Sequence, residues 1–308
     1  MEFLNEILHS KRENFYYIEK CKIATKNGNV AYLTSNEENK IQYWNIPIAN
    51  TTVIVLGLGT SISQAAVKLL SKAGVLIGFA GNEGESLYAG NEIEWFTPKL
   101  NYRPTKYVQS WCSFWYDKEK RLEVARKLLL FRIDFFNKIW KSKDLYYGYK
   151  KVDFTQVLGT FNKKISLAKN IEELTSTEAH FVKALYGFAS VITEQRSFKR
   201  DFKGKDDINI FLNIGHHLTY GLAASTLWVL GIPQSFGIIH GETRKGSLIF
   251  DIADLVKCSV ILPIAFLESA QKTSIQDFKK ECFYKLKKHN CMDYMFNSIK
   301  NICTEFKL

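Results

Sequence analysis

The first hundred residues alternate short apolar runs with polar turn residues, a pattern typical of β-strands. Two β-prone runs, residues 16–24 and 30–34, flank Asn27-Gly28. This dipeptide predicts a hairpin, because Asn-Gly accepts the positive φ angles of a tight two-residue turn. Further strands are predicted at residues 52–56, 75–79 and 92–96, with one helix at 62–73, where apolar residues fall on one face.

The pattern changes to a helical period after this region. Pro98 and Pro104 lie in a polar stretch, residues 97–105, that predicts an interdomain linker. The expected fold class is α+β: a small β-rich N-terminal domain at residues 1–100, then a larger all-α domain at residues 101–308. Apolar residues recur every three or four positions in the predicted helices at 107–116, 118–141, 175–194, 208–230, 255–270 and 274–307, the last with a break near 289–290.

Charge points to a polyanionic partner. The 308 residues include 42 Lys and Arg against 31 Asp and Glu, a formal net charge of +11. Lys and Arg bind nucleic acid by neutralising phosphates and releasing counterions. Solubility alone is the alternative explanation for this excess, and charge by itself does not decide between them.

The cysteine pattern and the apolar runs point to a soluble, cytoplasmic protein. The six cysteines include no pair with the two-residue gap of a zinc knuckle or a redox motif. The N-terminus lacks a basic segment followed by an apolar one, so no signal peptide is expected. No apolar run approaches the roughly 20 residues that a membrane helix needs.

A dinucleotide-binding site is a weak alternative in the N-terminal region. Gly57-Leu58-Gly59 follows a predicted strand and precedes a helix, but Ile62 stands where a third glycine is needed. The acidic residue expected after the next strand is not evident. A structural turn into the helix is the preferred interpretation.

A stronger constellation lies in the C-terminal half. His240 ends an apolar approach, a glycine-containing turn follows, and the next apolar run leads to Asp251 and Asp254. Aspartates at positions i and i+3 of a helix point to the same side. A histidine and carboxylate oxygens suit a hard divalent ion that keeps positions open for phosphate oxygens.

Structural explanations of these residues carry equal weight on spacing alone. Asp251 stands where the N-cap of the helix at 255–270 would be, and His240 would then be a buried, hydrogen-bonded imidazole. Glu178 is available as a third carboxylate. With Thr175, however, it also fits a capping box at the start of a helix.

A basic stretch, residues 195–207, separates Glu178 from His240. It carries Arg196, Lys199 and Arg200, followed by two further lysines. Such a stretch is either a solvated loop or a segment that follows a phosphate backbone near the site, and the two interpretations have equal weight.

Several sequence blocks resemble the CRISPR-associated adaptation integrase, the Cas-one family. The blocks that carry this resemblance are Asn213-Ile-Gly-His-His-Leu-Thr-Tyr-Gly, then Leu230-Gly-Ile-Pro, then the segment from His240 to Asp254. The resemblance covers nearly the whole chain. Blocks at residues 43–52, 56–61, 102–107 and 111–115 resemble the type I-F branch in particular.

The resemblance implies roles for individual residues. Glu178, His240 and Asp254 match the family's catalytic metal ligands, for Mg²⁺ or Mn²⁺, and Asp251 matches the first aspartate of the catalytic pair. It also implies that the β-rich domain dimerises and that the α-helical domain is catalytic. The turn at residues 241–247 adds Arg244 and Lys245 as candidate DNA-phosphate contacts.

The implied function is a metal-dependent DNA endonuclease and integrase that inserts protospacer DNA into a CRISPR array by transesterification. The implied partners are double-stranded and branched DNA, a second copy of the chain, and the Cas-two protein fused to a helicase-nuclease. A non-catalytic DNA-binding scaffold of the adaptation complex is the alternative, and a nucleotide-cofactor enzyme is a distant third.

Overall fold

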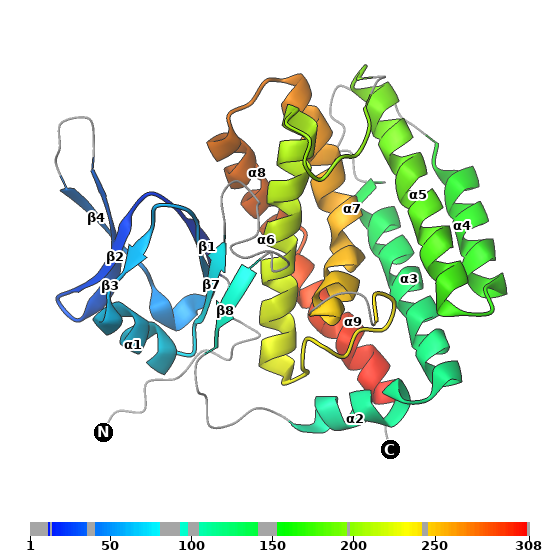
Figure 1. Ribbon diagram of the computed structural model, residues 1–308, viewed down its shortest axis with the longest axis horizontal. Helices are drawn as coiled ribbons and strands as arrows, with labels where there is room; N and C mark the ends of the chain where they lie inside the picture. Colours follow the sequence, from blue (N-terminus) through cyan, green and yellow to red (C-terminus); the bar gives the residue numbers. More distant parts are fainter. Residues whose placement is uncertain are drawn as a thin grey trace. The chain divides into compact units, whose positions relative to one another are not determined.

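The computed structural model describes residues 12, 14–35, 41–80, 93–97, 105–140, 153–195, 198–241 and 246–306. Its internal contacts divide the chain into two compact units, Met1–Arg103 and Pro104–Leu308. The described strands all belong to the first unit, and all but one of the described α-helices to the second (Figure 1). The predicted α+β class is confirmed.

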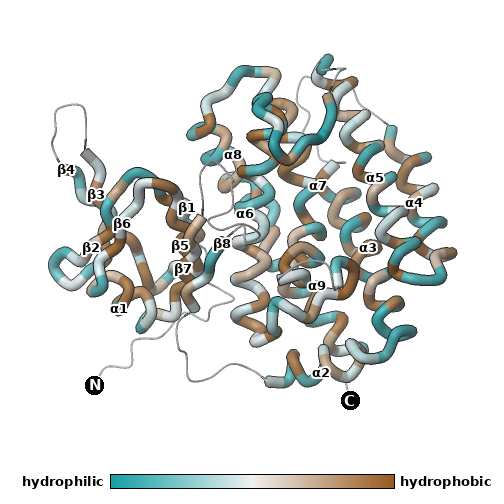
Figure 2. Tube along the Cα trace, viewed as in Figure 1, coloured by the Kyte–Doolittle hydropathy of each residue, from teal (hydrophilic) through white to brown (hydrophobic). Residues whose placement is uncertain are grey.

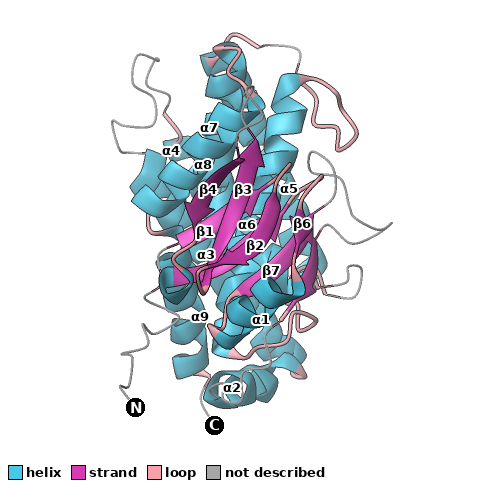
Figure 3. Cartoon of the chain, turned by 90° about the vertical axis from the view of Figure 1, so that its left-hand side faces the viewer, coloured by secondary structure: helices cyan, strands magenta, loops and turns pink. Residues whose placement is uncertain are grey.

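The N-terminal unit contains two four-stranded sheets (Figure 3). One has the strand order β1-β5-β7-β8 and the other β4-β3-β2-β6. One helix, α1 (Gln64–Lys72), connects β6 to β7. The strands are β1 (Asn14–Ile18), β2 (Lys22–Lys26), β3 (Asn29–Ser35), β4 (Ile41–Asn45), β5 (Thr51–Leu56), β6 (Ser61–Ile62), β7 (Leu76–Ala80) and β8 (Ile93–Phe96).

The core of this unit is built around β5. All six residues of β5 are buried, and the strand pairs in parallel with β1 on one side and β7 on the other. Figure 2 shows hydrophobic colouring along β5 and β7. The apolar run Val53–Leu56 fits a central strand that is covered on both faces.

The predicted hairpin is confirmed, but one of its strands is shorter than expected. β2 and β3 pair antiparallel and end at Lys26 opposite Asn29, with φ of 50° at Asn27 and 78° at Gly28. The single strand expected at residues 16–24 is wrong. It breaks around Lys20, whose φ is 51°, because the chain turns there to place β1 and β2 in different sheets.

Gly57 and Gly59 lie in the turn after β5, and the structure gives each a structural reason to be glycine. A Cβ at Gly57 would lie 2.6 Å from the Tyr17 hydroxyl oxygen, and Gly59 has a φ of 72°. The Ser63 hydroxyl accepts a hydrogen bond from the Ala66 amide at 3.3 Å and so caps α1. Gly57 is therefore packed against protein, at the first of the two positions where a dinucleotide would need backbone access.

The C-terminal unit is an assembly of helices around α7, which contacts α3, α5, α6, α8 and α9 (Figure 1). Both α6 and α7 are buried along most of their length. None of the helices in the described part of the chain is long and apolar enough to cross a membrane. The helices are α2 (Thr105–Trp115), α3 (Lys118–Trp140), α4 (Thr155–Leu167), α5 (Ile171–Ile192), α6 (Asp207–Leu230), α7 (Ser247–Ala270), α8 (Ile275–Lys288) and α9 (Cys291–Glu305).

Three helices differ from the sequence prediction. Helix α4 was not predicted, α5 begins four residues before the expected residue 175, and α7 begins eight residues before the expected residue 255. The break expected near residues 289–290 is confirmed, with Asn290 at a φ of 50° between α8 and α9. The two early starts change the interpretation of Glu178 and Asp251.

Candidate metal centre

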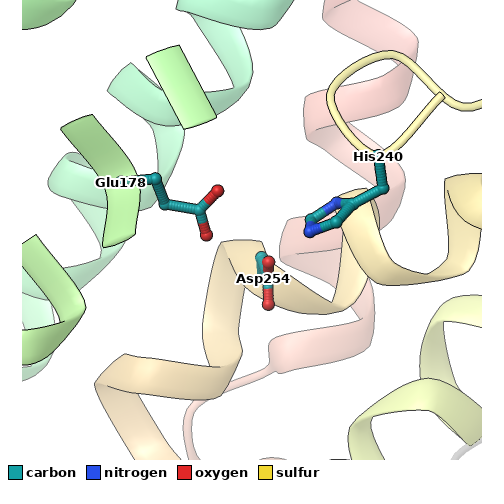
Figure 4. Close-up of side chains that lie close together, drawn as sticks. All are labelled: Glu178, His240 and Asp254. Atoms are coloured by element: carbon teal, nitrogen blue, oxygen red, sulfur yellow. The ribbon is translucent and has the colours of Figure 1, made fainter. Parts of the chain in front are cut away.

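Glu178, His240 and Asp254 come together in the C-terminal unit. Glu178 projects from α5, Asp254 from α7, and His240 from the segment that precedes α7 (Figure 4). One ligand atom from each residue lies within 4.8 Å of those of the other two. Side chains separated by up to 76 positions in the sequence therefore surround one point.

Glu178 does not cap its helix. The N-cap of α5 is Asn170, whose side-chain oxygen accepts a hydrogen bond from the Glu173 amide at 2.8 Å. The predicted capping box of Thr175 and Glu178 is therefore wrong, because the helix starts one turn earlier. Glu178 lies in the interior of α5 with 8% of its surface exposed, a position that costs free energy unless the carboxylate has a partner.

Asp251 fixes the segment that carries His240. Its carboxylate accepts hydrogen bonds from the backbone amides of Ile238, Ile239 and His240 at 2.6, 3.1 and 3.1 Å. Its Oδ1 also lies 2.7 Å from His240 Nδ1. Because Nδ1 donates to this carboxylate, the lone pair of the neutral imidazole is on Nε2.

The N-cap interpretation of Asp251 is wrong. Helix α7 begins at Ser247, and its N-cap is Gly246, so Asp251 lies in the second helical turn. The i, i+3 relation to Asp254 is as predicted, but the two carboxylates have different partners. Asp251, 2% exposed, holds the His240 segment, while Asp254 faces Glu178 and His240.

Two tryptophans of α2 hold the same segment through its carbonyl oxygens. Trp111 Nε1 donates to the Phe236 carbonyl at 3.1 Å, and Trp115 Nε1 donates to the Gly237 carbonyl at 3.0 Å. At Gly237 a Cβ would lie 2.2 Å from Ser247 Oγ, so the segment passes the start of α7 at a distance that only glycine permits. His240 is thus presented from a rigid segment.

A cation lies beside each of the two carboxylates of the cluster, Glu178 and Asp254. Arg132 on α3, 1% exposed, donates from Nη1 to Glu178 Oε1 at 2.5 Å and from Nη2 to Cys258 Sγ at 2.9 Å. Lys257 forms an ion pair with Asp254, one helical turn away on α7. The buried negative charges are therefore individually paired.

These contacts shift the pKa values of the cluster in different directions. Burial raises the pKa of Glu178, against the opposing attraction of Arg132. Burial also acts to raise the pKa of Asp254, but Lys257, Arg132 and His240 outweigh it and the net shift is downward. For His240, burial acts to lower the pKa, but the hydrogen bond that the imidazole donates to Asp251 and the charges of Asp254, Asp251 and Glu178 raise it overall.

The His240 shift predicts opposite pH dependences for metal binding and for metal-free stability. A metal needs neutral imidazole, so Mn²⁺ affinity should fall about tenfold per pH unit below the raised His240 pKa. In the metal-free protein the stabilisation by protonated His240 is fully present below the unfolded pKa near 6.5 and is lost as pH rises through the folded pKa.

Mn²⁺ titration calorimetry and urea unfolding between pH 5.5 and 8.5 measure the two effects. Mn²⁺ affinity that stays constant across this range would contradict the assignment of His240 as a ligand. The exposed His180 of α5 provides the control, since His180→Gln should leave both pH profiles unchanged.

The donor set fits a divalent ion of the Mg²⁺ and Mn²⁺ class. Metal–oxygen and metal–nitrogen bonds of about 2.0–2.6 Å place donors on opposite sides of one ion up to roughly 5 Å apart. The three donors satisfy this limit. A cavity of about 10 Å³ beside the carboxylates of Glu178 and Asp254 is about the size of one water molecule. The imidazole nitrogen favours Mn²⁺ at least as much as Mg²⁺.

The basic loop after α5 is attached to α6 by Arg200. Its Nη1 donates to Asn209 Oδ1 at 2.8 Å and its Nη2 to Asn213 Oδ1 at 2.6 Å. Lys199 beside it is exposed. Arg200 therefore has a structural partner set, whereas Lys199 faces solvent. The other predicted DNA contacts, Arg196, Arg244 and Lys245, lie outside the described residues.

Sequence reasoning missed Arg132, Lys257 and the roles of Trp111 and Trp115. Arg132 had a detectable signal, because it stands on an otherwise apolar helix face between Leu129 and Phe136. Lys257 had one as well, at i+3 from Asp254. The tryptophan contacts join residues more than 120 positions apart, and no local pattern reveals them.

Comparisons with known proteins place the chain in a family. A family model described as CRISPR associated protein Cas1 matches residues 16–289. A CRISPR-associated endonuclease Cas1 from Pseudomonas aeruginosa (strain UCBPP-PA14) is 41% identical over 97% of this chain and 95% of its own length.

Two solved structures share the fold at low sequence identity. A TtCas1–DNA complex has a TM-score of 0.69 at 21% identity, covering 94% of this chain and 91% of that one. A casposase bound to integration product has a TM-score of 0.67 at 14% identity, covering 94% and 82%. The family match over most of the chain and the close, full-length relative show that this chain belongs to the CRISPR associated protein Cas1 family.

Proposed function

We propose that this chain is a metal-dependent DNA endonuclease and integrase that joins protospacer DNA to a CRISPR array. The observation that carries the proposal is the convergence of Glu178, His240 and Asp254 within 4.8 Å. Its 41% identical relative is named an endonuclease, and a casposase bound to integration product has the same fold.

The charges around the cluster favour a phosphodiester substrate. Glu178, Asp251 and Asp254 supply three negative charges, and Arg132 and Lys257 supply two positive ones. With neutral His240 the centre carries one net negative charge, and a divalent cation changes this to one net positive charge. A positive, partly buried centre attracts the phosphate anion and the extra charge that develops on it during phosphoryl transfer.

The proposed reaction is a transesterification at a DNA phosphate. A 3′-hydroxyl attacks the phosphorus, a new P–O bond forms, and the bond to the leaving 3′-oxygen breaks; water in place of the hydroxyl gives cleavage. A bound Mg²⁺ or Mn²⁺ would stabilise the phosphate charge and orient the attacking oxygen. Asp251 keeps His240 in one tautomer, and Arg132 holds Glu178 in place.

Cleavage of branched DNA with and without metal tests the function. We expect strand cleavage and joining with MnCl₂ or MgCl₂ and neither reaction with EDTA. DNA binding should persist in EDTA, since affinity comes from distributed phosphate contacts. Activity that is insensitive to EDTA would exclude the proposed chemistry.

We propose DNA contacts along the basic loop after α5, for which Lys199 is the clearest candidate because its side chain is exposed. Lys199→Gln is expected to lower the slope of log affinity against log salt by about one unit. Fluorescence anisotropy with labelled duplex DNA measures this slope. Lys163→Gln on α4 is an equally exposed control. An unchanged slope in the Lys199 variant would leave the solvated loop as the better account.

Arg200 is also a proposed DNA contact, but its substitution is harder to interpret than that of Lys199. Arg200 already bonds two asparagines of α6, so Arg200→Gln mixes a loss of loop attachment with any loss of DNA contact. Arg196, Arg244 and Lys245 remain proposed DNA contacts from their sequence positions. Among these five candidates, the Lys199 substitution tests a proposed phosphate contact with the least change to the protein's own contacts.

The proposed assembly is a homodimer through residues 1–100, with two dimers on a central Cas2 dimer fused to a helicase-nuclease, in the cytoplasm. The similarity to the type I-F branch in the sequence supports this arrangement. A non-catalytic DNA-binding scaffold is the second candidate. It would need no metal, and it gives no reason for three donors to meet in a buried position.

A further inference from the structure

Two cations, the buried Arg132 and the partly buried Lys257, flank the proposed metal ligands without belonging to the ligand set. Arg132 is 1% exposed and reaches Glu178 from α3 across the helix interface. Lys257 reaches Asp254 from the next turn of α7, and its side chain is 15% exposed. Each carboxylate that would bind a metal is therefore already in contact with a positive charge.

The two cations offset the electrostatic cost of burying two neighbouring carboxylates in the metal-free protein. Glu178 and Asp254 are both buried, and their ligand atoms lie within 4.8 Å of one another. Two unpaired carboxylates at this distance would repel each other and would both lose hydration. The ion pairs with Arg132 and Lys257 compensate for both effects without a metal.

The same cations oppose a divalent ion at the same point. A unit charge and a divalent ion about 5 Å apart repel each other by roughly ten times the thermal energy even at an effective dielectric constant of about 20. We propose that Arg132 and Lys257 are counter-cations that stand in for the metal in the metal-free protein and lower its affinity for the ion. The inference rests on the proposed function, because it takes Glu178, His240 and Asp254 as the ligands.

Lys257 gives the cleaner test of the two. Arg132 also bonds Cys258 and is sealed in the core, so its loss removes several contacts at once. Lys257 has a flexible, partly exposed side chain that pairs with Asp254, and its ammonium also lies 5.6 Å from the centre of the Tyr220 ring. Lys257→Met keeps an unbranched side chain one atom shorter and removes its charge.

Lys285 on α8 is a matched control. It forms an ion pair with Glu281 one turn away, and its side chain is also 15% exposed. Lys285→Met therefore removes a comparable helical ion pair at a site with no proposed metal ligand. If the loss of a helical ion pair by itself lowers stability, both Lys257→Met and Lys285→Met should show that loss.

The experiment is calorimetric titration of the purified full chain with MnCl₂, together with thermal unfolding with and without MnCl₂. Lys257→Met is expected to lower the metal-free Tm, to tighten Mn²⁺ binding by about tenfold or more, and to show a larger Mn²⁺-induced rise in Tm than the wild type. Lys285→Met should keep the wild-type Mn²⁺ affinity and the wild-type Mn²⁺-induced rise in Tm.

Unchanged or weaker Mn²⁺ binding by folded Lys257→Met would overturn the inference and leave the metal centre itself standing. Absence of Mn²⁺ binding in the wild type would instead overturn the proposed metal centre. If Lys257→Met does not fold without metal, the same titration on Lys257→Gln decides, because its amide can still donate to Asp254 while lacking the charge. Tighter Mn²⁺ binding is expected there too, and weaker or equal binding overturns the inference.

Discussion

Replacing Asp254 with alanine is expected to slow metal-dependent cleavage of branched DNA by about 10³-fold or more. The substitution removes one of three converging donors, and the charge stabilisation that a bound metal supplies to phosphoryl transfer amounts to several kcal/mol. DNA affinity should change by no more than about threefold, since phosphate contacts are distributed over the surface. Single-turnover cleavage and fluorescence anisotropy measure the two quantities.

Asp277 on α8 provides the control for this substitution. Its carboxylate is exposed and accepts hydrogen bonds from Lys280 on α8 and from Ser274, the N-cap of α8, so Asp277→Ala should leave the cleavage rate within about twofold of the wild type. Asp254→Asn, which keeps the volume of the side chain, should behave like Asp254→Ala. A cleavage rate within tenfold of the wild type for both Asp254 variants would exclude Asp254 as a ligand.

Asp251→Asn is expected to lower the free energy of unfolding by about 2–4 kcal/mol and metal affinity by about 10- to 100-fold. The carboxylate accepts from three backbone amides and from His240 Nδ1 in a position only 2% exposed. An asparagine amide nitrogen is a donor and would face N–H groups. At least one buried amide then loses its acceptor, and His240 loses its fixed orientation.

Urea unfolding and Mn²⁺ titration check this prediction against Asp206→Asn. Asp206 caps α6 by accepting a hydrogen bond from the Asn209 amide, and asparagine is nearly as good an N-cap, so its loss should cost less than about 1 kcal/mol. If Asp251→Asn matches the wild type in both stability and Mn²⁺ affinity, the Asp251 network does not position His240.

The sequence predicted the helices and the ligand candidates where the signal is local. Residues 208–230 have apolar residues recurring at the spacing of a helix, and α6 occupies Asp207–Leu230. Asn27-Gly28 predicted the β2–β3 turn from its dihedral preference alone. The spacing of Asp251 and Asp254 placed both carboxylates on one side of a helix, which α7 confirms.

Long-range contacts account for the errors. Asp251 resembled an N-cap because aspartate near a helix start usually accepts local amides, but its partners are 11 to 13 residues upstream in a separate segment. The parallel pairing of β1 and β5 joins strands more than 30 residues apart and needs the whole sheet to be known. Helix α4 has two buried side chains, Phe161 and Ile165. Two buried positions make too weak a helical pattern to be detected in the sequence.

The arrangement of the site also required tertiary information. Spacing could not decide between a ligand and a capping role for Glu178, because both occur near helix starts. In the structure Asn170 caps α5 and Arg132 bonds Glu178. Glu178 is therefore a carboxylate in the interior of the helix, paired with a cation. Its convergence with His240 and Asp254 depends on the packing of α5 against α7.

Anomalous diffraction from a Mn²⁺-soaked crystal, recorded near the manganese absorption edge, tests the central claim most directly. We predict one strong peak within about 2.0–2.6 Å of a carboxylate oxygen of Glu178, a carboxylate oxygen of Asp254 and Nε2 of His240. The peak should be absent from an Asp254→Ala crystal soaked in the same way. A manganese peak elsewhere in the chain, with none between these three side chains, would contradict the account.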